Sequence, residues 1–591
     1  MPITVELHFS LAFLPQAAGQ LLTPSKTSVR EAGKCLRFSG RSLTQLSLEL
    51  VVILSEAISS VTPLRWYASK MHPCCARYAF SLLASHTTSA ARSASSQLRS
   101  RALLPTPRVA MFSTSRQFRY ASQVPKEQPG DEADDVLFGS LYGVRTVELN
   151  RPKKLNSLNG SMARKILPRL REWENSQMAN MIMITGAGPK AFCAGGDVAE
   201  LARNNSTKEG QQKSTDYFAL EYQLDHLIST YSKPYIAIMD GITMGGGVGL
   251  SVHAPFRIAT EKTVFAMPET TIGFFPDVGG SFFLSRMDGE VGTYLALTSE
   301  NLHGVQALYA GIATHYLDSS VLQPLTTRLS ELQFKDHASM QERLTLINNT
   351  LAEFTTELPA PDSYPKAKNG NISGELREAI DKCFSFNTVD EILAALRREE
   401  GGTGKIADWA QATIKTIAMR SPTSLKVTLK QLRLGKNWSI GETFVREHEM
   451  AARFMQHPDF TEGVSARLIN KPPTKPNWQP ATLEEVSDSD VDEFFVLPED
   501  VEPMELIEGS PASLRDYMDY PHARFGLPRE RDIEAVVRNK GRQGANGVEN
   551  EVLKQWNNKP GVSEKVADVL ERKTSTRGGE LHWKDRQRAS L

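Results

Sequence analysis

Two stretches of this chain repeat the same order of apolar strand, glycine-rich turn and helix. The run MIMIT at 181–185 leads to AFCAGGDV at 191–198, and PYIAIMDG at 234–241 leads to GITMGGGVGL at 241–250. A short apolar run followed by glycines and a helical pattern is typical of a strand in a sheet that helices cover. The repetition therefore predicts an α/β core.

Further patterns set the expected limits of this core. Another strand is expected at 139–150, and 256–269 alternates like a paired hairpin or short strands. From about 284 to 421 the apolar pattern turns helical, and the last helical segment ends at KPPTKPNWQP, 471–480. We expect one folded domain over 134–480 with a helical C-terminal part.

The first 120 residues have the composition of a leader. Residues 1–126 carry fifteen Lys or Arg and only four Asp or Glu. Arg- and Ser-rich, acid-poor sequence is typical of a mitochondrial transit peptide, which would send the protein to the matrix. A disordered basic tail is the alternative. All four acids precede Met71, where a more conventional presequence begins, so we expect 1–70 to be a gene-model extension or a poorly ordered leader.

Residues 481–591 form a long charged extension. Residues 484–508 hold eleven acids and no Lys or Arg, whereas 572–588 are net basic. Weak hydrophobicity and blocks of like charge favour an extended or partner-dependent segment. The alternative is a loose appendage without function.

Several classes of function find no support in the sequence. The formal net charge is zero, which gives no case for nucleic acid as an obligate partner. The five cysteines show neither metal-ligand spacing nor a disulfide framework, and no run is long enough to suggest a membrane span. Neither glycine run matches a P-loop or a dinucleotide fingerprint. We expect no metal and no cofactor.

The glycines and two carboxylates together suggest chemistry on a carbonyl group. Small residues at 194–196 and 245–247 let backbone N–H groups approach a ligand closely. Two such donors on one oxygen form an oxyanion hole. Glu269 and Asp277 lie eight residues apart in MPETTIGFFPDVGG, an otherwise apolar and glycine-rich stretch. This combination suits a thioester carbonyl; an N-cap or salt bridge is the simpler interpretation of Glu269.

These motifs resemble one known superfamily. NRPKKLNSLN, AFCAGGDV, the block at 241–284 and HPDFTEGVSARLINK are similar to crotonases, the enoyl-CoA hydratase/isomerase superfamily, over about 135–480. Within it the chain is most similar to the 3-hydroxyisobutyryl-CoA hydrolase family. The resemblance implies a crotonase-like spiral of ββα repeats. It also implies an acyl-CoA substrate in a bent conformation, so that CoA is part of the substrate.

The resemblance also implies roles for individual residues. The N–H groups of Gly196 and Gly246 would hold the thioester oxygen, Lys153, Lys154 and Leu155 would lie near the CoA adenine, Glu221 would contact substrate, and Glu269 and Asp277 would be catalytic.

Two positions separate the members of the superfamily. Hydratases place a second catalytic glutamate where this chain has Gly249, so water addition to a double bond is disfavoured. Asp277 stands where typical hydratases have glycine and the hydrolases have aspartate. Hydrolysis of 3-hydroxyisobutyryl-CoA in valine breakdown is therefore favoured over an enoyl-CoA isomerase or hydratase. Asp277 would bind the substrate hydroxyl, and Glu269 would be either nucleophile or general base.

A third interpretation belongs to another class of protein. Fungal members of this hydrolase family are also components of the small subunit of the mitochondrial ribosome. The extension at 481–591 would suit a docking arm to ribosomal proteins, with its basic end near rRNA. Both roles can coexist because the site residues are intact.

Overall fold

The computed structural model describes residues 118–121, 123–360, 372–514 and 516–584. All of them belong to one compact unit, Thr114–Leu591. The expected transit segment and the 1–70 extension fall almost entirely on residues 1–117, outside the described part of the chain.

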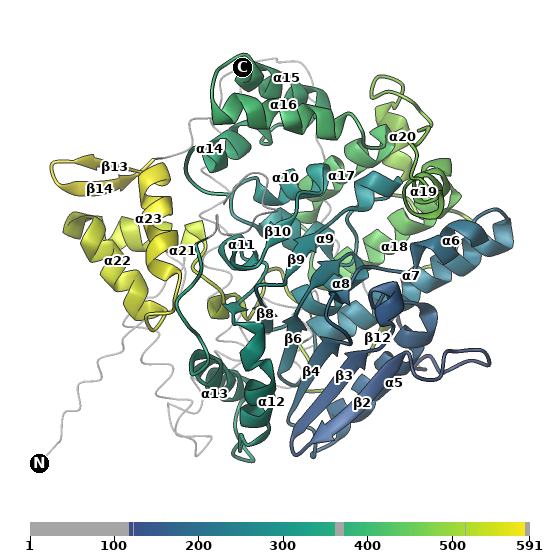
Figure 1. Ribbon diagram of the computed structural model, residues 1–591, viewed down its shortest axis with the longest axis horizontal. Coiled ribbons are helices and arrows are strands. Elements are labelled where there is room, and N and C mark those ends of the chain that lie inside the picture. Colours follow the sequence, from purple (N-terminus) through teal and green to yellow (C-terminus); the bar gives the residue numbers. More distant parts are fainter. Residues whose placement is uncertain (1–117, 122, 361–371, 515, 585–591) are drawn as a thin grey trace, which may run out of the picture. The chain divides into compact units, whose positions relative to one another are not determined.

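Two sheets form the core (Figure 1). The larger has the strand order β11-β8-β6-β4-β3-β2, and the smaller has the order β10-β9-β7-β5. The strands of the larger sheet are β2 (Val136–Leu141), β3 (Val144–Leu149), β4 (Met181–Gly186), β6 (Tyr235–Met239), β8 (Phe256–Ala259) and β11 (His315–Tyr316). Those of the smaller sheet are β5 (Ala191–Cys193), β7 (Ile242–Met244), β9 (Val264–Ala266) and β10 (Leu302–His303).

Consecutive strands alternate between the two sheets. In each of the pairs β4–β5, β6–β7 and β8–β9, the first strand joins the larger sheet and the second joins the smaller one. Helices follow these pairs, so the expected spiral of ββα repeats is confirmed. β7 pairs in parallel with both β5 and β9. Because parallel neighbours end at the same edge of a sheet, the glycine turns after β5 and β7 lie together.

The structure corrects two strand predictions. The single strand expected at 139–150 is wrong, because β2 and β3 form an antiparallel hairpin that turns at Tyr142 and Gly143. Tyr142 has φ 47°, a conformation that glycine or asparagine adopts more readily than tyrosine. The sequence at this position therefore does not predict the turn. Residues 256–269 do form short strands, but β8 and β9 lie in different sheets, so the hairpin alternative is wrong.

Helices cover the sheets and form the C-terminal part of the core. They are α5 (Gly160–Asn175), α6 (Val198–Asn204), α7 (Lys208–Ser229), α8 (Gly246–Val252), α9 (Gly280–Phe283), α10 (Val291–Thr298), α11 (Val305–Tyr309), α12 (Leu322–Ser330), α13 (Met340–Ala352), α14 (Gly374–Cys383), α15 (Val389–Glu400), α16 (Lys405–Ile417), α17 (Pro422–Gly435), α18 (Ile440–Gln456) and α19 (Pro458–Val464).

α7 is the helix that shapes the site. It starts at Thr207, whose side chain accepts a hydrogen bond from the Gly210 N–H, and it packs against α5, α8 and α18. Its buried face carries Glu221 and Asp225 beside apolar residues. Buried carboxylates are rare unless they are paired or functional.

The prediction that the extension is extended is wrong. It folds into α20 (Asp488–Glu493), β12 (Leu506–Ile507), α21 (Glu530–Lys540), α22 (Gly544–Gln555), α23 (Val562–Lys573), β13 (Thr574–Arg577) and β14 (Glu580–Trp583), and the elements from α21 onward are yellow in Figure 1. β12 pairs in parallel with β1 (Tyr120–Ala121). Buried apolar side chains of the extension, among them Leu527, Val536 and Val566, join the hydrophobic cluster of the core. Buried charge pairs and aromatic contacts add to this attachment.

Among the described residues, none of the helices combines the length and the apolar character that crossing a membrane requires.

Candidate active site

The two glycine turns meet at the edge of the smaller sheet. Gly195 has φ +108° and Gly245 has φ +45°, conformations that favour glycine. A Cβ placed on Gly245 would lie 3.3 Å from the Gly195 Cα, and one placed on Gly246 would lie 3.5 Å from the Gly196 nitrogen. The backbone segments of both turns therefore lie close together, with no room for side chains between them.

This arrangement leaves two backbone donors side by side. The Gly196 N–H donates no hydrogen bond to another group of the described residues. Gly246 is the first residue of α8, where an N–H has no acceptor within the helix. Two unused donors at this separation have the geometry that an oxyanion requires.

Glu269 faces the glycine turns from the short 3₁₀ helix Glu269–Ile272, which follows β9. Its side chain is only 5% exposed. The Oε1 atom would lie 3.2 Å from a Cβ on Gly245, and the buried Oε2 atom has no hydrogen-bond partner among the described residues. Phe275 and Met267 are fully buried around it. An unpartnered buried carboxylate beside open N–H groups is unlike an N-cap or a salt bridge.

Asp277 lies on the loop after that 3₁₀ helix and is also buried. The Tyr222 hydroxyl donates a 2.8 Å hydrogen bond to its Oδ2. The next residue, Val278, has φ 51°, a strained conformation for a β-branched residue. Strain of this kind persists only where neighbouring groups hold the backbone in place.

Two carboxylates of α7 complete the cluster. Glu221 and Asp225 are one helical turn apart and face Gly246 and Gly249 of α8, which are also about one turn apart. A Cβ on Gly246 would lie 2.3 Å from Glu221 Oε1, and a Cβ on Gly249 would lie 2.4 Å from Asp225 Oδ2. Asp225 thus fills the space into which a glutamate at position 249 would project. The Glu221 Oε1 and both Asp225 oxygens have no partner within the described residues.

Burial and mutual repulsion favour the protonated forms of these acids. Burial raises the pKa of Glu269, Glu221 and Asp225 well above the usual range, and neighbouring carboxylates raise it further. Burial also raises the pKa of Asp277 to about 7, although the Tyr222 hydrogen bond opposes the rise. The cluster therefore holds protons near neutral pH and can exchange them during a reaction.

The turn at Lys153–Leu155 lies next to the first glycine turn. The Ala194 N–H donates to the Leu155 carbonyl at 3.0 Å. Lys154 Nζ lies 3.0 Å from Asp197 Oδ2, one residue after Gly196, and its side chain is 58% exposed. Lys153 is exposed. These basic side chains are available to a negatively charged ligand that enters beside Gly196.

A cleft of about 770 Å³ adjoins this region. Its lining includes Asp197, Tyr217 and Asn159. The Tyr217 hydroxyl would lie 3.1 Å from a Cβ on Gly196, so this residue lies between the cleft and the glycine turn.

Other reactive residue types take no part in this geometry. The Cys193 thiol is buried and lies 3.6 Å from the Gly195 carbonyl, and burial raises its pKa to about 12. Such a thiol is not a nucleophile at neutral pH. In the part of the chain that the structure describes, no group of three His, Cys, Asp or Glu side chains is placed to hold a metal ion.

The structure brings together Gly196, Gly246, Glu221, Glu269 and Asp277, with the Lys153–Leu155 turn beside them. Sequence analysis missed Asp225 and Tyr222. The spacing of Asp225 four residues after Glu221 was the available signal, because side chains at i and i+4 share a helix face.

Comparison with known proteins assigns the chain to a family. The sequence model of the enoyl-CoA hydratase/isomerase family matches residues 144–495. The chain is 53% identical to small ribosomal subunit protein mS47 of Neurospora crassa, over 78% of this chain and 91% of that protein. It is 44% identical to the mitochondrial 3-hydroxyisobutyryl-CoA hydrolase of Gallus gallus, over 62% of this chain and 89% of the relative.

A solved structure supports the same assignment. The crystal structure of a carnitinyl-CoA dehydratase from Mycobacterium thermoresistibile is similar with a TM-score of 0.54 and 35% identity. The match covers 62% of this chain and 98% of that one. With its alternating sheets and paired glycine turns, this chain belongs to the enoyl-CoA hydratase/isomerase family.

Proposed function

We propose that this protein hydrolyses 3-hydroxyisobutyryl-CoA to 3-hydroxyisobutyrate and CoA in the mitochondrial matrix. The observation that carries the proposal is one buried carboxylate, Glu269, beside two open backbone donors; its Oε2 atom has no hydrogen-bond partner among the described residues. The position of a second hydratase glutamate is Gly249, and Asp225 fills the space beside it. A relative of the same family that is 44% identical bears the name of this hydrolase.

The first step is polarisation of the thioester carbonyl. Its oxygen would accept hydrogen bonds from the Gly196 and Gly246 N–H groups, which lie side by side. Each donor of this kind contributes about 3–4 kcal/mol when charge develops on the oxygen. The CoA portion would pass the Lys153–Leu155 turn, where basic side chains suit its phosphates.

Glu269 then acts on the carbonyl carbon in one of two ways. As a nucleophile its oxygen bonds to the carbon, the C–S bond breaks, and water cleaves the resulting anhydride. As a general base it takes a proton from the water that attacks. In both cases the departing thiolate needs a proton. Glu221, with its raised pKa, would be protonated and could supply it.

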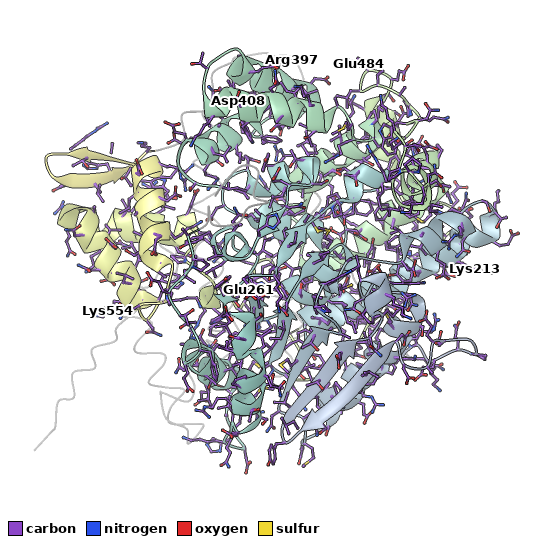
Figure 2. The ribbon with its side chains drawn as sticks, viewed as in Figure 1. Lys213, Glu261, Arg397, Asp408, Glu484 and Lys554 are labelled. Atoms are coloured by element: carbon purple, nitrogen blue, oxygen red, sulfur yellow. The ribbon has the colours of Figure 1, made fainter. Side chains whose placement is uncertain are left out.

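Asp277 is expected to select the hydroxylated substrate. A carboxylate that accepts a hydrogen bond from the substrate hydroxyl favours that substrate strongly over an analogue without it. We expect Asp277→Asn to lower the ratio of kcat/KM for 3-hydroxyisobutyryl-CoA over isobutyryl-CoA about a hundredfold. CoA release from both thioesters measures this ratio. Asp408→Asn on the exposed surface of α16, labelled in Figure 2, is the control. An unchanged ratio would remove Asp277 from substrate recognition.

The pH profile is expected to report the raised pKa of Glu269. Glu269 acts only when ionised, so kcat/KM should rise as its carboxyl loses a proton. Burial and the nearby Asp277 charge place this limb well above 4.5, the usual pKa of a glutamate. Asp277→Asn removes the repulsion and should move the limb to lower pH. A wild-type limb near pH 4.5 would contradict the buried site.

A second role in the mitochondrial ribosome is supported by a different observation. The mS47 relative matches 78% of this chain, whereas the hydrolase relative matches 62%. We propose that the protein also binds the small subunit through its C-terminal extension. Arg542, Lys554 and Arg577 are exposed there, and Figure 2 labels Lys554 on α22. Exposed basic residues suit contacts with rRNA phosphates.

Charge reversal tests this second role without removing the folded extension. We expect the triple change of Arg542, Lys554 and Arg577 to Glu to abolish salt-resistant co-sedimentation with mitochondrial small subunits. The control reverses Lys208, Lys213 and Arg397, which are exposed on α7 and α15. If the extension variant still co-sediments as the control does, these side chains are not the contact.

A further inference from the structure

A short segment of the C-terminal extension is fastened to the core behind the active site. We call residues 516–520 the strap. The Ile440 N–H donates to the Tyr517 carbonyl at 3.0 Å, and the Tyr517 hydroxyl donates to the Ser229 carbonyl at 3.2 Å. Arg286 Nε donates to the Met518 carbonyl at 2.9 Å. The strap therefore has a fixed position against α7, α18 and the 3₁₀ helix Leu284–Arg286.

One strap residue reaches the loop that carries Asp277. The Tyr520 hydroxyl lies 2.7 Å from His253 Nδ1, and His253 Nε2 lies 2.9 Å from the Val278 carbonyl. A carbonyl can only accept a hydrogen bond, so Nε2 carries the proton and donates. Nδ1 is then an acceptor, and the Tyr520 hydroxyl donates to it. Burial lowers the pKa of His253 to about 4, which keeps the ring neutral.

The Val278 carbonyl fixes the histidine tautomer, and the Tyr520 hydroxyl donates to the nitrogen that this tautomer leaves as an acceptor. In the opposite tautomer, Nδ1 would carry the proton and the Nε2 lone pair would face the lone pairs of the Val278 carbonyl. The partner of one ring nitrogen commonly decides what the other nitrogen can do. The Tyr520 hydroxyl thus holds the imidazole ring in the orientation in which Nε2 reaches the Val278 carbonyl.

The loop needs such a hold because its backbone is strained. Val278 has φ 51°, and a Cβ on Gly279 would lie 2.4 Å from the His253 ring. Glu447 accepts hydrogen bonds from the Gly279 and Ser281 N–H groups at 2.7 and 2.8 Å. These contacts fix the residues after Asp277, and the bond from His253 fixes the adjacent carbonyl.

We propose that Tyr520 is a positioning residue for the active site: through the orientation of the His253 ring it holds the Val278 carbonyl, and with it the Asp277 carboxylate, in place. The strap lies beyond residues 144–495, the part that matches the family model. The extension would then contribute to substrate selection without touching the substrate. The inference rests on the proposed function only for its activity readout.

The strap offers a matched pair of variants for the test. Tyr520→Phe removes the hydroxyl that contacts His253. Tyr517→Phe removes a hydroxyl from the same strap, but that hydroxyl contacts Ser229 instead. Both rings pack edge-on against Phe282, with centroids 5.0 and 5.6 Å from it. Each change therefore removes one hydroxyl and one hydrogen bond from the same strap, and only Tyr520→Phe removes the link to His253.

The first measurement is hydrogen exchange by mass spectrometry on the peptide that spans the loop. In Tyr520→Phe we expect faster exchange of the Gly279 and Ser281 N–H groups, because the loop is less firmly held. Tyr517→Phe should leave this peptide unchanged. Equal exchange in the two variants would overturn the proposal, whether or not the protein is a hydrolase.

The second measurement is selectivity between 3-hydroxyisobutyryl-CoA and isobutyryl-CoA. We expect Tyr520→Phe to lower the ratio of kcat/KM about five- to tenfold, the usual effect of one lost hydrogen bond. In a His253→Gln background, the Tyr520 change should have no further effect, because its hydroxyl acts only through the imidazole. A further loss of selectivity from Tyr520→Phe in that background would overturn the proposal that Tyr520 acts through His253. If the wild type cleaves neither thioester, the proposed function fails, and exchange alone decides the role of Tyr520.

Discussion

Replacing Glu269 by Gln is expected to lower kcat for 3-hydroxyisobutyryl-CoA by about 10³- to 10⁴-fold. An amide can neither attack the thioester carbonyl nor take a proton from water, so both versions of the mechanism fail. The loss should appear mainly in kcat, because the oxyanion donors and Asp277 remain. Steady-state CoA release, followed with a thiol reagent, measures it.

The fold of this variant should be intact. Burial and repulsion already favour the neutral form of Glu269, and the neutral amide has nearly the same shape. We therefore expect an unchanged or higher Tm. Glu484→Gln on the exposed surface, labelled in Figure 2, is the control for the substitution itself. If Glu269→Gln keeps more than about a tenth of the wild-type kcat, the mechanism is wrong.

Replacing Arg377 by Met is expected to cost about 3 kcal/mol of the free energy of unfolding. Arg377 is 2% exposed on α14. Its Nη1 lies 2.8 Å from Glu530 Oε1 on α21, and its Nε lies 3.2 Å from Asp381 Oδ1. Removing the guanidinium leaves the largely buried Glu530 and Asp381 carboxylates without one of the cations that compensate their charge. Arg572 still contacts Glu530, so the cost falls at the lower end for a broken buried pair.

Denaturant unfolding measures this cost, and an exposed pair supplies the control. Arg328 Nε lies 3.0 Å from Glu353 Oε2, and these side chains are 39% and 49% exposed. Arg328→Met should cost under about 1 kcal/mol, as exposed ion pairs do. Equal costs for the two substitutions would contradict the view that buried charge pairs fasten the extension to the core.

The sequence predicts the core and the chemistry of the site because both depend on local patterns. The apolar strands and glycine turns at Gly196 and Gly246 occur in short runs that are read directly. The carboxylates of α7 were harder to interpret, because the sequence does not show which face of a long helix is buried. Only the structure shows that Asp225 lies opposite Gly249 and therefore belongs to the site.

The extension shows the opposite case. Its charge blocks predict an extended segment, yet it folds because its apolar side chains, such as Val536 and Val566, join the hydrophobic cluster of the core. Its charges also pair with residues far away in the sequence. Glu530 pairs with Arg377 across 153 positions, and Tyr520 contacts His253 across 267. Composition counts charges but does not reveal such partners. The sequence also predicts one strand where the structure has a hairpin that turns at Tyr142. A tyrosine at positive φ is not a residue type that indicates a turn.

The most direct measurement is CoA release by the purified protein from 3-hydroxyisobutyryl-CoA, beside isobutyryl-CoA and crotonyl-CoA. We expect rapid release from the hydroxylated thioester, slow release from isobutyryl-CoA, and neither hydrolysis nor hydration of crotonyl-CoA. Hydration of crotonyl-CoA, or no release from any of the three, would contradict the hydrolase assignment. The second of these results would leave the ribosomal role as the leading function of the chain.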